Sequence, residues 1–348
     1  MKQGRGLVAL TLFLMTTDVA LDIGTSTSRL ATAQEGVIFN EPTIVAIDTR
    51  SGNVVEVGFG AMDLVARTSR HVVAFRPLAQ GATVDFDVTA RLISGLLERA
   101  GISKLSRVRA VMSVPSLATA IERRALRQAA VQAGAREVSL IEAPLAAAIG
   151  LGLPVQDPVG SAVTVLGGGA SEATLISLGG IVTSGKRRQG GSDLDRAIAS
   201  SLRHRYGVVI SPAAAETLKI NLASALGRTK GMSETVVART VERGELVEVE
   251  VAADLVNAAL HDVLGAMVKM VQDSLGTAPP DLSQDVSTRG LTLVGGHARL
   301  RDVAQLIAEG TGVDVTVADE PELVVIRGLQ MCLEEMASLH SLFRDADR

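Results

Sequence analysis

The sequence predicts an α/β fold built from two similar halves. Apolar, strand-like runs alternate with helix-like segments along the 348 residues, an order typical of layered α/β proteins. Two segments, 19–33 and 163–178, each join two apolar runs through a turn rich in Gly, Ser or Thr, which is the pattern of a β-hairpin. They lie about 140 residues apart, so we expect two copies of one architecture. Aromatic residues amount to 2% of the chain, so Ala, Val, Leu and Ile must form the core, as in parallel sheets covered by helices.

Composition excludes several classes of protein. The net charge of −4 gives no electrostatic reason to expect nucleic-acid binding. The single cysteine, Cys332, excludes an intramolecular disulfide and fits a reducing compartment. No Cys/His cluster has the spacing of zinc ligands. At this length the chain should form two domains or one large divided domain.

The first residues allow three interpretations. Lys2 and Arg5 precede an apolar stretch, residues 7–15, that resembles the front of a signal peptide. It is shorter than the roughly 20 residues that span a bilayer. The stretch is either a passive extension or mis-assigned start, a segment that lies on the membrane, or an export signal.

The elements of the first half follow from local patterns. The run VALDI (19–23) reads as a strand entering the first hairpin, and VRAVMSV (108–114) reads as a buried strand that ends at Pro115. Residues 119–134 have the apolar spacing of a helix that stops at a glycine. Pro144 opens a further helix, where its missing N–H costs nothing. The segment 153–160 contains two prolines and marks the predicted domain boundary.

The second half repeats this logic. We expect a strand from 163 into the second hairpin, a helix over 193–205 capped by Ser192, and another over 213–226. Residues 236–251 alternate and indicate an antiparallel strand pair. A long helix over 254–275, a loop over 274–285, a strand running into a glycine turn over 290–296 and a helix over 300–310 follow. A strand over 313–317 and a helix over 322–338 complete the chain.

Three strand-to-glycine turns are candidates for anion binding. They are DIGTST (22–27), GGG (167–169) and GGH (295–297). Glycine lets backbone N–H groups approach an anion closely, because no Cβ intervenes. Two such hairpins facing each other could grip a polyphosphate, Asp22 would hold Mg²⁺ through waters, and the third turn could support a purine. Purely structural turns are the alternative, and the sequence contains neither a P-loop nor a GxGxxG motif.

Longer segments of the sequence resemble one family. LDIGTSTS (21–28), FNEPTIVAID (39–48), SVPSLATAIERRAL (113–126), LIEAPLAAAIGLGLP (140–154) and LVGGHARLRDV (293–303) are similar to signature segments of MreB and Mbl, the bacterial actin homologues. The resemblance runs from about residue 18 to about residue 336. It implies an actin-like ATPase fold of two ribonuclease H-like domains, each with a smaller insertion, and ATP in the cleft between them.

The resemblance also implies domain limits, partners and a location. Domain I would contain 18–154 and 318–348 with an insertion at 38–76, after an extension over 1–17. Domain II would contain 155–317 with an insertion at 190–250. The chain would be cytoplasmic and would form filaments at the inner face of the cell membrane. It would assemble with itself or with an MreB paralogue, alongside wall-synthesis membrane proteins.

The family's site residues carry over position by position. Asp22, Gly24, Thr25 and Ser26 match the first phosphate loop, with Asp22 as the metal-handling acid, and Gly167, Gly168 and Gly169 match the second loop. Glu122 matches the glutamate that orients the attacking water. The nucleoside side is matched by Lys219, Asn221, Ser224, Gly295, Gly296 and His297.

Four positions depart from the family pattern. Val165 stands where the family has an aspartate that helps to place Mg²⁺ and water, and Ala170 replaces a threonine. Asn221 replaces a glutamate, and His297 replaces a glycine. Charge placed at a reacting phosphate typically contributes factors of about 10² to 10³ in rate. We therefore expect hydrolysis to suffer more than binding, so the chain is a weak ATPase at most.

Two other functions remain open from the sequence. One is a nucleotide-independent scaffold that partners a conventional paralogue, and the other is a sugar kinase or chaperone-type ATPase on the same fold. Relatives commonly reach the membrane through an N-terminal helix or an apolar loop. Here residues 7–15 and the loop tip Leu105 are the candidates.

Overall fold

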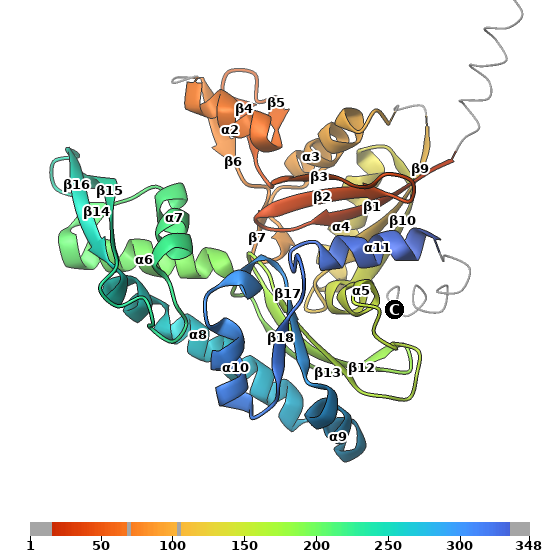
Figure 1. The fold of residues 1–348 in the computed structure, drawn as a ribbon. Helices are drawn as coiled ribbons and strands as arrows, with labels where there is room; N and C mark the ends of the chain where they lie inside the picture. Colours follow the sequence, from red (N-terminus) through yellow and green to blue (C-terminus); the bar gives the residue numbers. More distant parts are fainter. Residues whose placement is uncertain (1–15, 68–70, 103–105, 335–348) are drawn as a thin grey trace, which may run out of the picture. The chain divides into compact units, whose positions relative to one another are not determined.

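The chain separates into two compact units. The computed structural model describes residues 16–67, 71–102 and 106–334 (Figure 1). Unit 1 contains the residues up to 156 together with those from 323 onward, and unit 2 contains residues 157–322. The candidate membrane segment 7–15 and Leu105 lie outside the described residues.

Unit 1 is built on a five-stranded sheet with the strand order β10-β9-β1-β2-β3 and on a three-stranded sheet with the order β5-β4-β6. In the larger sheet, β1 pairs antiparallel with β2 and parallel with β9. Its elements are β1 (Thr16–Ile23), β2 (Thr27–Thr32), β3 (Gly36–Pro42), β4 (Val45–Asp48), β5 (Val54–Val57), α2 (Gly58–Arg67), β6 (Val72–Phe75), β7 (Leu78–Ala79), β8 (Ala82–Thr83), α3 (Phe86–Arg99), β9 (Arg107–Val114), α4 (Ala120–Gln132), β10 (Ala135–Glu142), α5 (Ala143–Gly150) and α11 (Val324–Glu334).

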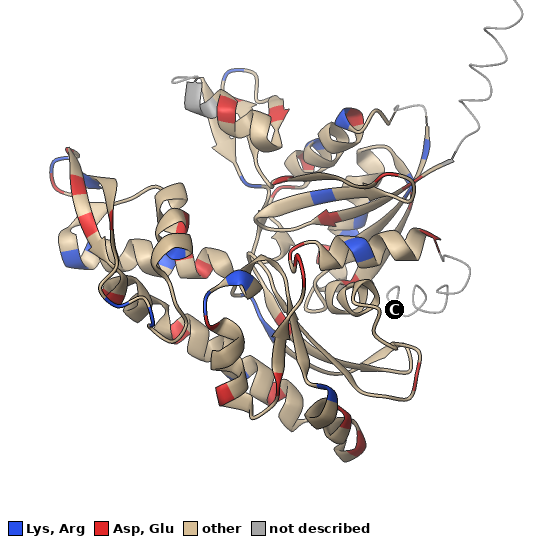
Figure 2. Cartoon of the chain, in the orientation of Figure 1, with Lys and Arg blue, Asp and Glu red and all other residues tan. Residues whose placement is uncertain are grey.

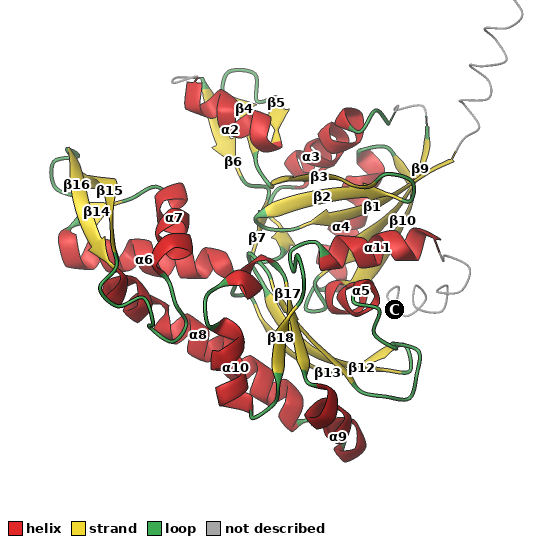
Figure 3. Ribbon diagram, viewed as in Figure 1, coloured by secondary structure: helices red, strands yellow, loops and turns green. Residues whose placement is uncertain are grey.

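Unit 2 is built on a sheet with the order β13-β12-β11-β17-β18, and β14-β15-β16 form a separate small sheet. The long helix α8 packs against β12 and β13 (Figure 3). Its elements are β11 (Ser161–Leu166), β12 (Ser171–Ser177), β13 (Gly180–Arg187), α6 (Gly191–Tyr206), β14 (Val208–Val209), α7 (Pro212–Leu222), β15 (Ser233–Thr240), β16 (Leu246–Ala252), α8 (Ala253–Gly276), α9 (Pro280–Arg289), β17 (Leu291–Val294), the 3₁₀ helix η1 (Gly296–Arg299), α10 (Val303–Thr311) and β18 (Val315–Val317).

The two large sheets have the same topology. In both, the first strand of a hairpin lies at the centre, pairs antiparallel with the second strand, and pairs parallel with a strand from later in the unit. The third strand extends the antiparallel side and a further parallel strand extends the other side. The prediction of two copies of one architecture is therefore confirmed.

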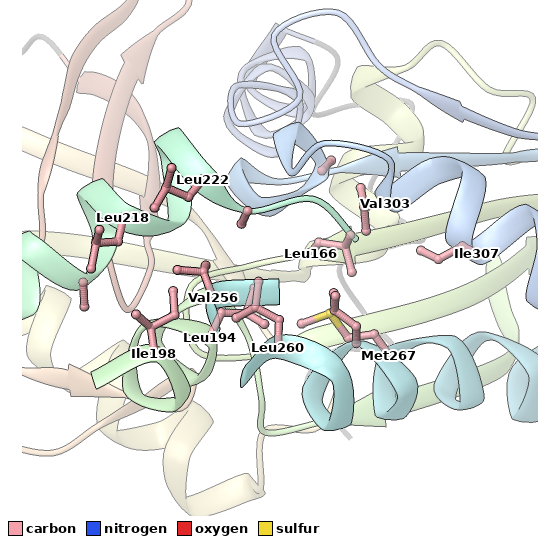
Figure 4. Packing of buried hydrophobic residues seen from close by; sticks show 14 of the residues in the cluster. Leu166, Leu194, Ile198, Leu218, Leu222, Val256, Leu260, Met267, Val303 and Ile307 are labelled. Carbon is pink, nitrogen blue, oxygen red and sulfur yellow. The ribbon is translucent and has the colours of Figure 1, made fainter. Parts of the chain in front are cut away.

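Each unit has its own aliphatic core, as the low aromatic content predicts. In unit 1, Val19, Leu21 and Ile23 of β1 pack with residues of α3, β9 and α4. In unit 2, Leu166 of β11 belongs to a buried cluster that also contains side chains of α6, α7, α8 and α10 (Figure 4). Because successive strand residues point to opposite faces, Asp22 and Val165 point away from these cores.

Several details of the predicted elements are wrong, and one of them is the start of α10, which begins at Val303 and not at residue 300. Residues 280–289 form helix α9, although the prolines at 279 and 280 suggested a loop; Pro280 stands in the first turn, where its missing N–H is harmless. Helix α6 begins at Gly191 with Gly190 as its cap, not at Asp193 with Ser192 as its cap. Helix α7 ends at Leu222 and not at Leu226.

Candidate functional site

The first hairpin is closed by a glycine and braced by neighbouring loops. The N–H of Gly24 donates to the carbonyl of Thr27 at 3.0 Å. A Cβ at position 24 would stand 2.9 Å from that same oxygen, so the turn requires glycine. The hydroxyl of Thr25 accepts a hydrogen bond from the N–H of Gly81 at 2.9 Å, and the carbonyl of Ser26 accepts from the N–H of Thr43 at 2.9 Å. The predicted phosphate loop is thus held in one shape.

Asp22, the predicted metal-handling acid, has partners for both carboxylate oxygens. The hydroxyl of Ser113 donates to Oδ1 at 2.5 Å, and the guanidinium of Arg29 donates to Oδ2 at 3.0 Å. Arg29 lies directly across the hairpin from Asp22. The side chains of both are mostly buried, with 11% of Arg29 and 14% of Asp22 exposed. Their charges therefore compensate each other away from bulk water.

The second hairpin uses the same closure. The N–H of Gly167 donates to the carbonyl of Ala170 at 3.0 Å, and a Cβ at 167 would stand 2.8 Å from that oxygen. The start of α6 braces this tip, because the N–H groups of Gly191 and Ser192 donate to the carbonyls of Gly167 and Gly168 at 3.1 and 2.9 Å. The two hairpins therefore share one backbone design.

The charge around the second hairpin is arranged differently. Val165 is half-buried and stands where Asp22 stands in the first hairpin, two residues before the closing glycine. Its cross-strand partner is Glu172, which is 3% exposed. Glu172 in turn lies opposite Lys186 of β13. The hairpin does contain an acid, but on its second strand.

Lys219, the predicted nucleoside contact, is buried at 6% exposure and already paired. Its ammonium lies 2.7 Å from Oδ1 of Asp195 and 3.2 Å from Nε2 of His297. Burial, and then the charge of Lys219, lowers the pKa of His297 from 6.5 to about 3, while the backbone of Gly167 acts in the opposite direction. The imidazole ring is therefore neutral at physiological pH.

The other residues predicted to lie on the nucleoside side differ in their burial and in their hydrogen-bond partners. Ser224 is buried at 2% exposure, and its hydroxyl donates to Asp302 at 2.5 Å. Asn221 is exposed and donates from Nδ2 to Glu234 at 2.9 Å. The N–H of Gly295 donates to the carbonyl of Pro321 at 2.7 Å, and Gly296 opens η1 directly before His297. Of this set, Lys219 and His297 are in direct contact.

Glu122, the predicted catalytic residue, forms a capping box at the start of α4. Its Oε2 accepts from the N–H of Thr119 at 2.8 Å, and its own N–H donates to the Thr119 hydroxyl at 3.2 Å. This motif satisfies two N–H groups that a helix start leaves unpaired. Glu122 therefore has a structural role that is independent of any catalytic one.

The residues of the two units fit a directly coordinated divalent cation poorly. Within the described ranges, no group of three His, Cys, Asp or Glu side chains could hold a metal. Asp22, the acid next to the tip of the first hairpin, faces a guanidinium 3.0 Å away, which opposes a cation. Hydrated Mg²⁺ usually depends on one or two carboxylates and the phosphates of its ligand. The described residues therefore do not form a ready-made site for this ion.

Four contacts around the candidate site residues were missed by the sequence analysis. They are the Arg29 partner of Asp22, the position of Glu172 across from Val165, the Asp195 partner of Lys219, and the packing of His297 on Gly191. The first two could have been found by pairing residues outward from each closing glycine. The last two join helices distant in sequence and carry no local signal.

The fold and the sequence both match known proteins. The family model for MreB/Mbl protein matches residues 16–341. The chain is 37% identical over 333 residues to the cell shape-determining protein MreB of Escherichia coli K12, covering 94% of this chain and 96% of that protein. It is 32% identical over 323 residues to Mbl of Bacillus subtilis 168, covering 92% and 97%.

Solved structures show the same architecture. MreB5 of Spiroplasma citri bound to ADP matches with a TM-score of 0.85 at 24% identity, covering 94% of this chain and 98% of that one. The MamK double helical filament matches with a TM-score of 0.76 at 18% identity, covering 92% and 99%. With the duplicated sheets described above, these matches establish an actin-like fold, and the chain belongs to the MreB/Mbl family of cell shape-determining proteins.

Proposed function

We propose that this chain binds ATP through its two glycine hairpins and forms filaments that support cell shape. The observation that carries the proposal is the repeated hairpin, which occurs at the same position of two sheets with the same topology. MreB5 of S. citri, which has this fold, has been crystallised with ADP and with AMPPNP. MreB of E. coli and Mbl of B. subtilis are cell shape-determining proteins.

In this proposal each hairpin contributes backbone donors to the phosphates. The tip of the first hairpin adds the hydroxyls of Thr25 and Ser26. Thr25 accepts its bond from Gly81 through an oxygen that can still donate its own proton to a phosphate. The second hairpin contributes N–H groups of Gly168 and Gly169, held in place by the bonds from α6. Rigid donors of this kind lose little entropy when an anion binds.

Hydrolysis is weak in this proposal because the second hairpin lacks an acid at position 165 and a hydroxyl at position 170. The half-buried isopropyl group of Val165 can neither accept a proton nor orient water. Glu122 orients the attacking water in this proposal, in addition to its role in the capping box. Losing preorganised charge at the reacting phosphate costs a factor of about 10² to 10³ in rate.

The filament would assemble from copies of this chain, alone or with a paralogue, at the inner face of the cytoplasmic membrane, where it would guide wall synthesis. The MamK double helical filament, which has the same fold, supports self-assembly. Among the helices of the described ranges, none has the length and apolar character needed to cross a bilayer. Lys and Arg are interspersed with Asp and Glu along both units (Figure 2). We therefore assign membrane contact to the apolar segment 7–15.

Pelleting with liposomes tests the membrane contact. The Leu10→Glu/Leu12→Glu variant places two charges in the apolar segment and should remain in the supernatant when the parent protein pellets. Equal pelleting of parent and variant would refute the assignment.

A titration with a fluorescent ATP analogue, with and without Mg²⁺, tests nucleotide binding. We expect saturable binding by the parent and a loss of about 10²-fold in Gly168→Asp, which sets a carboxylate among the phosphate donors. Gly265→Asp is the matched control, because position 265 is exposed on α8, has open space around it and has no positive φ. Its affinity should equal that of the parent. Absence of binding at millimolar analogue would contradict the proposal.

One observation favours a second candidate, a nucleotide-independent scaffold. The cation predicted to contact the nucleoside, Lys219, is buried and already paired with Asp195 and His297. A scaffold would sediment as filaments equally well with and without ATP. A nucleotide-dependent protein would sediment at least several-fold more in the presence of ATP.

A further inference from the structure

The ring of His297 fills a corner of unit 2 formed by Gly191, Lys219 and the tip of the second hairpin. A Cβ placed on Gly191 would come within 1.4 Å of Nε2 of His297, so the ring lies directly against the Gly191 backbone. The N–H of Gly191 donates to the carbonyl of Gly167 at 3.1 Å. Gly191, the first residue of α6, therefore contacts both the ring of His297 and the closing glycine of the hairpin.

The hydrogen bonds of this corner fix the state of the ring. An ammonium group has no lone pair, so Lys219 must donate and Nε2 of His297 must accept in their 3.2 Å contact. The proton of the neutral ring is then on Nδ1. That nitrogen is buried, and the backbone of Gly167 is the hydrogen-bonding group that favours protonation of the ring.

The corner coincides with the nucleoside end of the proposed site. Lys219, Gly295, Gly296 and His297 were all assigned to that end from the family resemblance. A glycine at position 297 would leave the space over Gly191 open, and it would leave one direction of the Lys219 ammonium free for a ligand. The imidazole of His297 fills this space and accepts the hydrogen bond that Lys219 donates in this direction.

We propose that His297 closes the nucleoside end of the site, so that this chain recognises the polyphosphate of its ligand with little preference for the base. The inference rests on the proposed binding of phosphate by the glycine hairpins. It makes His297 a specificity-determining residue. The ligand class becomes a triphosphate, with or without an attached nucleoside, in place of ATP alone.

Calorimetric titrations with inorganic tripolyphosphate, ATP, GTP and CTP test this inference on the full chain. For the parent we expect dissociation constants within about threefold of one another. In His297→Gly, the opened corner should favour ATP over tripolyphosphate by at least about tenfold. His297→Gln retains a neutral side chain that can accept from Lys219, and it should keep the parent's lack of preference.

The outcomes separate this inference from the proposed function. A parent that binds ATP at least about tenfold more tightly than tripolyphosphate would overturn the inference and leave phosphate binding intact. An unchanged ratio in His297→Gly would overturn it as well. A parent that binds neither tripolyphosphate nor any nucleotide would overturn the proposed function itself.

A second pair of variants tests the position of the ring without any ligand. Gly191→Ala in the parent must displace the imidazole, and we expect its melting temperature to fall by about 5 °C. The same substitution in the His297→Gly background no longer meets the ring and should lower the melting temperature by much less. Equal shifts in both backgrounds would mean that the ring does not lie against Gly191, and the inference would fail.

Discussion

The two glycine hairpins have the same backbone and different charges. Both close with a glycine whose N–H donates at 3.0 Å to the carbonyl three residues later. In the first hairpin, Asp22 and Arg29 face each other as an ion pair. At the corresponding positions of the second, Val165 faces Glu172. The closing glycine therefore specifies the shape of the turn, while the charge at its base varies independently.

The difference in charge affects how each hairpin would bind an anion. In the first, the negative charge of Asp22 is compensated by Arg29 within the same hairpin. In the second, the first strand presents an aliphatic side chain, and the acid has Lys186 as its neighbour on the other side. Binding through backbone donors depends on the shared feature, whereas the chemical step depends on the feature that differs.

The largest expected effect comes from breaking the ion pair of the first hairpin. Asp22→Asn leaves the mostly buried Arg29 without its counter-charge, and we expect the free energy of unfolding to fall by about 3 kcal/mol. Chemical denaturation monitored by circular dichroism measures it. The double variant Asp22→Asn/Arg29→Met removes both charges and should recover most of the loss. If the double variant is as unstable as the single one, the ion pair is not the cause.

Restoring an acid to the second hairpin should lower the free energy of unfolding somewhat less than Asp22→Asn does. Val165→Asp sets a carboxylate directly opposite Glu172, which is 3% exposed, and like charges in a cross-strand pair repel. We expect a loss of about 2 kcal/mol in the presence of EDTA. Val165→Asp/Glu172→Gln removes the repulsion and should be more stable than Val165→Asp alone. Equal stability of the two variants would show that Glu172 does not face position 165.

The neutral ring of His297 predicts a dependence of stability on pH. Its folded pKa of about 3 lies below its unfolded value of 6.5, so the unfolded chain binds the additional proton between these values. The contribution of the neutral ring to the free energy of unfolding is complete above pH 6.5. It is lost as the pH falls, by about 1.4 kcal/mol per pH unit. Lys219 contacts the ring, and Asp195 pairs with Lys219. His297→Gln should lose about 1.4 kcal/mol less than the parent between pH 7.5 and 5.5; parallel profiles would contradict the buried neutral ring.

The smallest effect separates the two roles of Glu122. Glu122→Ala removes the capping box and should destabilise the protein by about 1 kcal/mol. Glu122→Gln can retain the cap and should be nearly neutral for stability. Both variants should reduce ATP turnover if Glu122 orients water. A glutamine variant with the parent's turnover would leave Glu122 with its structural role only.

The sequence predicted the parts of this protein that depend on local chemistry. The hairpin at Gly167 could be placed because glycine, flanking apolar runs and alternation are adjacent in the chain. Helix α9 was missed because two prolines in a row were interpreted as a loop, although Pro280 suits the first turn of a helix. The start of α6 was misplaced because bonds from the hairpin, rather than a side-chain cap at Ser192, satisfy its first N–H groups.

The site was predictable as a set of positions but not as a set of contacts. Lys219 was placed on the nucleoside side from its matching position. Its pairing with Asp195 and His297 depends on the packing of α6, α7 and η1, which no local pattern encodes. The neutral state of His297 likewise follows from burial and from the charge of Lys219, and both are tertiary properties.

One measurement tests the central claim that binding and hydrolysis depend on different features of the hairpins. Single-turnover hydrolysis of labelled ATP at saturating Mg²⁺ should be about 10²-fold faster in Val165→Asp than in the parent. The dissociation constant for ATP, measured in parallel, should stay within about threefold. Unchanged turnover with intact binding would contradict the account, because the aliphatic side chain at position 165 would then not be what limits the reaction.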